Sequence, residues 1–101
     1  MEEETKENPR RLALDRLRLT ALTHLAASVA AGVALERNSS KTSQEEAARR
    51  LAAVDGPSVL LDVAAIATTN DPRRLKAIIM EYRARARSRI KTAKAIAEAD
   101  I

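Results

Sequence analysis

The sequence contains no cysteine, phenylalanine or tryptophan, only two glycines, and a single aromatic residue, Tyr82. Without cysteine the chain can form neither disulfides nor thiolate metal sites, and it has no thiol nucleophile. Without large aromatic residues the core has to be built from Leu, Ile, Val and Ala. Most of the chain is also free of the helix breakers Gly and Pro, and it shows no alternating strand pattern. The sequence therefore predicts an all-α protein.

Helix-start signals occur at three points in the chain. Asn8-Pro9 and Asp71-Pro72 each place a helix-capping residue before a proline at the first helical position. Ser43, with Glu46 three residues later, forms a capping-box pattern. Together with polar breaks at 38–41 and 55–58, these signals predict a small bundle of four helices, two long and two short. The expected organisation is a disordered acidic tail at 1–7 and one helical domain at 8–101, with helices at 9–37, 44–54, 58–69 and 72–100.

The first predicted helix is apolar on two opposite sides, so both sides need to be covered. Two long helices would also project past two short ones. We therefore expect the bundle to be completed by dimerisation. One apolar side holds Leu12, Leu19, Leu22, Ala26, Val29, Ala30 and Val33, and the other holds Leu14, Leu17, Ala21, Leu25, Gly32 and Leu35.

Two features of the sequence bear on location. The first seven residues are acidic, which is the wrong charge for a signal peptide. Residues 19–35 carry no charged side chain, but this stretch has 17 residues and a membrane span needs about 20. We therefore expect a cytoplasmic protein without a membrane partner.

The charge of the chain is unevenly distributed. The net charge is +4, yet residues 72–101 alone hold nine Lys and Arg against three acidic residues. A basic last helix favours an anionic partner, either nucleic acid or an acidic protein face. One tyrosine cannot form a base-stacking platform, so contact with a duplex backbone is predicted. The candidate contact residues are Arg73, Arg74, Lys76, Arg83, Arg87, Lys91 and Lys94.

An arginine pair directly follows each of the two cap-proline signals. Positive charge in the first turn of a helix opposes the helix dipole, and a bound anion would compensate for it. The pair Arg10 and Arg11 is therefore a candidate anion site. The alternative is that an arginine-rich chain simply has arginines at many positions.

A second interpretation of the last helix is protein–protein interaction or oligomerisation. An apolar stripe runs along this helix, and it could dock a partner helix while the arginines keep the helix solvated. The residues expected to pack against the partner are Leu75, Ile79, Tyr82 and Ile90.

Residues 42–51, TSQEEAARRL, resemble the first helix of many helix-turn-helix DNA-binding domains. That resemblance implies a second helix carrying Arg, Lys, Asn or Gln toward base edges. Residues 58–69 offer only Ser58, Asp62, Thr68 and Thr69 as polar groups, so this segment is predicted to be core. The two alternatives are a sequence-reading domain and a plain helical hairpin.

No pattern for catalysis is present. His24 has no metal-ligand partner at helical spacing, no glycine-rich phosphate loop exists, and no carboxylate pair points to acid–base chemistry. We therefore predict no enzyme activity, no metal, no cofactor and no small-molecule substrate. The expected function is that of a non-catalytic, nucleic-acid-associated or regulatory protein.

Overall fold

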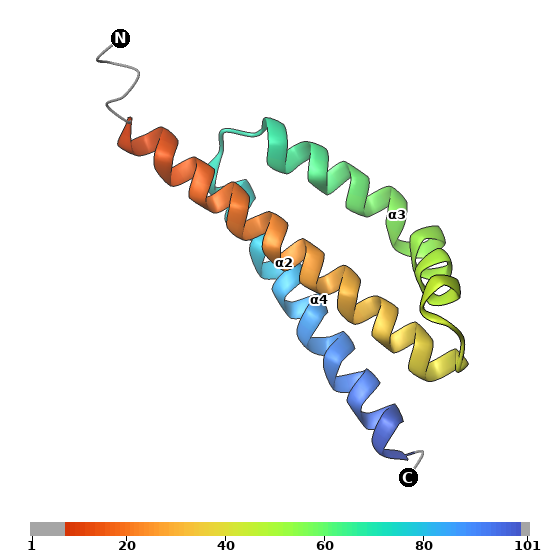
Figure 1. The fold of residues 1–101 in the computed structure, drawn as a ribbon. Helices are drawn as coiled ribbons and strands as arrows, with labels where there is room; N and C mark the ends of the chain where they lie inside the picture. Colours follow the sequence, from red (N-terminus) through yellow and green to blue (C-terminus); the bar gives the residue numbers. More distant parts are fainter. Residues whose placement is uncertain (1–7, 100–101) are drawn as a thin grey trace.

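A computed structural model describes residues 8–99, which form three helices (Figure 1). They are α2 (Pro9–Ser40), α3 (Gln44–Thr68) and α4 (Pro72–Ala99). The all-α class is confirmed, but the prediction of four helices is wrong. The predicted tail at 1–7 and the predicted end of the last helix at residue 100 lie outside the described residues.

The prediction failed at residues 55–58, through which α3 continues without a break. Pro57 removes one backbone N–H donor, which kinks a helix but does not have to end it. Figure 1 shows the first turns of α3 set at an angle to the rest of the helix. Asp55 is buried and paired with Arg89 of α4, and Ser58 Oγ donates to the Asp55 carbonyl over 3.0 Å. The Asp55–Arg89 ion pair joins α3 to α4 beside the proline, and the local sequence pattern does not reveal it.

The three predicted helix starts are confirmed by their capping hydrogen bonds. Asn8 Oδ1 accepts from the backbone N–H of Arg10 over 2.9 Å, and Asp71 Oδ1 accepts from that of Arg73 over 3.0 Å. Ser43 Oγ likewise accepts from Glu46 N–H over 3.2 Å. The caps therefore place the N-termini where the sequence indicated.

The end of α2 lies later than predicted, at Ser40 and not at Arg37. Asn38 Nδ2 donates to the Ala93 carbonyl of α4 over 3.1 Å, so a residue expected in a turn is held within the helix. Lys41 then ends α2 in the left-handed conformation, with φ 53°.

Short connections at 41–43 and 69–71 make α3 antiparallel to α2, and α4 parallel to α2 (Figure 1). α2 packs along α4 and less extensively along α3. The molecule is elongated, at 60 × 23 × 21 Å. Its buried core combines all three helices and consists of Ala21, Leu25, Ile66, Leu75, Ile78 and Tyr82.

Two polar contacts link α4 to α3. Arg89 Nη2 pairs with Asp55 Oδ2 at 2.6 Å, and the Tyr82 hydroxyl donates to Asp62. The two partners on each helix are seven residues apart, so the contacts fix the antiparallel register of α3 and α4. They also direct the only charged side chains of residues 51–68 toward α4.

Arg89 reaches its partners by passing close to the backbone of α2. Its Nη1 donates to the Ser28 carbonyl over 2.9 Å, and Ser28 is fully buried. A Cβ atom at Gly32 would lie 2.7 Å from both Arg89 Nη1 and Leu51 Cδ2. The three helices can therefore meet at this point only because residue 32 has no side chain.

Tyr82 gives a direct test of this packing. Burial, with the hydrogen bond to Asp62, raises the pKa of Tyr82 to about 12 from its ordinary value of 10.0. The protonated phenol thus contributes stability that is complete below about pH 10 and is lost as the pH rises through about 12. Because Tyr82 is the only aromatic residue, we expect tyrosinate absorbance to appear with a midpoint near pH 12 in the folded protein and near pH 10 in denaturant. Coinciding midpoints would contradict the buried placement.

The structure also overturns the expected cytoplasmic location. α2 and α3 are each long and apolar enough to cross a membrane, judged by length and composition. The sequence had shown one uncharged stretch of 17 residues, and the predicted break had divided α3 into two short helices. Two such helices are weak evidence for a membrane, because the core helix of a soluble protein passes the same test. The location of the protein is therefore not established.

Candidate nucleic-acid interface

Six basic residues form one line along α4, which we call the cationic row. With about 100° between successive residues, they fall within about 80° of one another around the helix axis. The side of α4 that faces the core holds Leu75 and Tyr82, and the row is centred about 130° away from these two residues around the axis. From its first to its last residue the row spans about 31 Å along the axis. Its members, all exposed, are Arg73, Lys76, Arg83, Arg87, Lys91 and Lys94.

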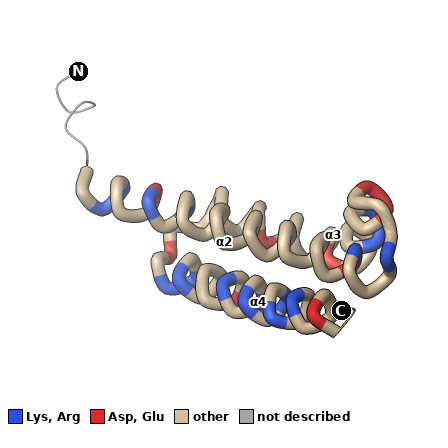
Figure 2. Tube along the Cα trace, turned by 60° about the horizontal axis from the view of Figure 1, so that its bottom comes forward, with Lys and Arg blue, Asp and Glu red and all other residues tan. Residues whose placement is uncertain are grey.

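The cationic row is largely free of intramolecular ion pairs. Arg73 Nε lies 3.6 Å from Asp71 Oδ1, but its side chain is 92% exposed. No other member of the row pairs with an acidic residue within 8–99. Figure 2 shows the basic residues gathered along α4, whereas the middle of α2 carries none. Five of the six members of the row therefore present positive charge to the solvent without an ion pair among residues 8–99.

The remaining arginines of α4 have structural partners. Arg89 pairs with Asp55 inside the bundle. Arg85 pairs with Glu81 at 2.6 Å and lies over the Tyr82 ring, 4.6 Å from its centroid. Arg74, which was predicted to join the contact surface, is exposed but lies at least about 100° from every member of the row around the axis. Six of the seven predicted contact residues are thus brought together and Arg74 is not.

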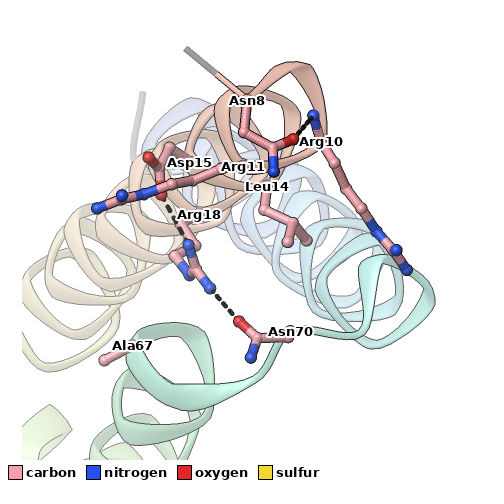
Figure 3. Close-up of a pocket in the computed structure, with 8 residues that line it drawn as sticks. All are labelled: Asn8, Arg10, Arg11, Leu14, Asp15, Arg18, Ala67 and Asn70. Carbon is pink, nitrogen blue, oxygen red and sulfur yellow. Dashed lines mark hydrogen bonds and ion pairs between the residues drawn. The ribbon is translucent and has the colours of Figure 1, made fainter. Parts of the chain in front are cut away.

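The candidate anion site at the start of α2 lies beside a shallow pocket of about 550 Å³. Figure 3 shows Arg10 and Arg11 extending in opposite directions, so the structure does not bring their guanidinium groups together. Arg18, deeper in the pocket, is already bound to Asp15 at 2.7 Å and to the Thr69 carbonyl at 3.0 Å. The pocket is therefore a place where Arg18 ties α2 to the α3–α4 connection.

The apolar stripe predicted to dock a partner is divided by the structure. Leu75 and Tyr82 are fully buried against the other helices of the same chain. Ile79 is half-buried at the edge of the core, and Ile90 is exposed. The stripe is thus mostly used within the chain, and α4 presents its charged side outward.

The segment 58–69 was predicted to be core, but only part of it is buried. Ile66 is buried, whereas Leu60 is 70% and Leu61 73% exposed. The uninterrupted α3 also has no turn at 55–58 that could separate the two helices of a helix-turn-helix unit. One apolar side of α3 is therefore exposed. The pattern of apolar residues in 58–69 did not reveal this, because the pattern alone does not say which side of a helix is covered.

Within the described part of the chain no group of three or more His, Cys, Asp or Glu could hold a metal ion. His24 is half-buried in α2. Comparisons with protein-family models, with curated proteins and with solved structures find no match.

Proposed function

We propose that the protein is a non-catalytic binder of double-stranded nucleic acid and that the cationic row contacts the phosphate backbone. The observation that carries the proposal is the row itself, with six exposed basic residues on one side of one helix. Long, flexible Lys and Arg side chains in such a line can each reach a phosphate and release its condensed counterions.

The composition of the row favours backbone contact over base reading. Neither Asn nor Gln lies on α4, and the single aromatic residue of the chain is buried. The row is also straight and about 31 Å long, which is close to one turn of a B-form duplex. Binding is therefore expected to depend strongly on salt and little on nucleotide sequence.

The test measures binding to two unrelated duplexes by fluorescence anisotropy between 50 and 200 mM salt. Changing both Arg87→Ala and Lys91→Ala removes two backbone contacts. We expect the slope of log K against log salt to fall by about 1.8 for both duplexes. Folding should be retained, because solvated, unpaired charges contribute little to stability.

A matched control is the double variant Arg49→Ala and Arg50→Ala on α3. It removes the same amount of charge from exposed residues that already pair with Glu46, and it leaves the row intact. Its salt slope should equal that of the parent. Equal slopes for the two double variants, or no binding of the parent at 50 mM salt, would refute the proposal. Binding to polyglutamate in the absence of duplex binding would assign the row to an acidic protein instead.

A further inference from the structure

The side of the molecule away from α4 is apolar across two helices. We define the α2–α3 face as Leu19, Leu22, Val29 and Val33 of α2 together with Leu60 and Val63 of α3. Leu19 is 66%, Leu22 42%, Leu60 70% and Val63 37% exposed. Residues 19–35 carry no charge, and the two charged residues of 51–68 point toward α4. The residues that define the face are therefore all uncharged.

A groove lies within this face between the two helices. It has a volume of about 320 Å³ and is lined by apolar residues, among them Val29, Val33 and Val59, and by one charged residue, Asp55, which is buried and paired with Arg89. Leu60 stands at its margin with most of its side chain in solvent. One molecule thus offers both a protruding apolar side chain and an apolar recess, as a self-complementary interface requires.

The distribution of charge favours a second copy over a lipid bilayer. Inserting α3 without α4 would leave Asp55 and Asp62 in hydrocarbon without their partners Arg89 and Tyr82. Inserting all three helices would carry the cationic row into the hydrocarbon as well. If the protein lay flat on a membrane with the α2–α3 face inserted, the cationic row would point away from the lipid headgroups. Interfacial helices instead keep their cations beside the headgroups. Two copies joined face to face keep both cationic rows outside and far apart.

We infer that the α2–α3 face is the interface of a symmetric homodimer. The apolar side of α2 that contains Leu19, Leu22 and Val33 is then covered by the partner. The side that contains Ala21, Leu25 and Gly32 is covered by α3 and α4 within the chain. This inference does not depend on the proposed function, because dimerisation and duplex binding use opposite sides of the molecule.

Light scattering coupled to size exclusion at micromolar concentration tests the inference. The parent should show twice the chain mass of 11.0 kDa. Leu60→Glu would bury a charge on each side of the interface, and we expect the dissociation constant of the dimer to rise on the order of a hundredfold or more. Met80→Glu is the matched control, because Met80 is also 70% exposed but lies on α4, and this variant should remain dimeric.

Circular dichroism checks that both variants keep the helical content of the parent. A monomeric parent, or equal masses for the Leu60 and Met80 variants, would overturn the inference. A parent mass above that of a dimer would overturn the two-copy arrangement. Flotation of the parent with phosphatidylcholine vesicles, with or without phosphatidylglycerol, that is lost in Leu60→Glu would assign the face to a membrane.

Discussion

Replacing Arg89 with methionine is expected to lower the free energy of unfolding by about 3–5 kcal/mol, because the change leaves a buried carboxylate without its partner. Asp55 lies in the middle of α3, with only 11% of its side chain exposed, and Arg89 is the one cation that pairs with it within residues 8–99. The Ser28 carbonyl would lose its arginine donor as well. A loss of this size is a large fraction of the stability of a small domain. Urea unfolding followed by circular dichroism measures it.

Arg87→Met is the control for this change. Arg87 lies two residues away on the same helix, but it is exposed and unpaired within the described residues, so its replacement should alter stability by less than about 0.5 kcal/mol. Adding Asp55→Leu to Arg89→Met should restore most of the lost stability, since the unpaired charge is removed. Equal effects of the two methionine variants would show that Arg89 is solvated in the folded protein.

Leu75→Ala is expected to cost about 2–5 kcal/mol of folding free energy, because it removes a fully buried leucine from the core between α2 and α4. The side chain lies near the start of α4, where it packs with Leu25, Ile78 and Tyr82. Thermal or urea unfolding at constant pH and salt gives the difference directly. A change below about 1 kcal/mol would place Leu75 outside the core.

Ile90→Ala is the matched comparison, since both residues belong to the stripe that the sequence assigned to partner packing. Ile90 is 57% exposed, so its replacement should change stability by about 0.5 kcal/mol or less. The two variants separate the part of the stripe that packs within the chain from the part that faces solvent. A large loss of folding free energy for Ile90→Ala, with little loss for Leu75→Ala, would mean that Ile90 and not Leu75 packs within the chain.

The all-α class, the three helix starts and the outward direction of the cationic row were predictable from the sequence. Each depends on local chemistry: caps at Asn8, Ser43 and Asp71 satisfy backbone N–H groups within the same turn, and the spacing of basic residues fixes their angle around a helix. These relations hold for any helix with this sequence, whatever it packs against. The number of helices was not predictable in this way, because a proline can either end or kink a helix and the local sequence around Pro57 does not decide between the two.

Only the tertiary structure decided which apolar surfaces are buried and which arginines turn inward. α2 has two apolar sides of similar composition, and packing against α3 and α4 covered the one that contains Ala21, Leu25 and Gly32. Arg87 and Arg89 are the same residue type two positions apart, yet only Arg89 faces Asp55 and the space above Gly32. Burial and ion pairing depend on groups far apart in the chain, so a pattern along one helix cannot specify them.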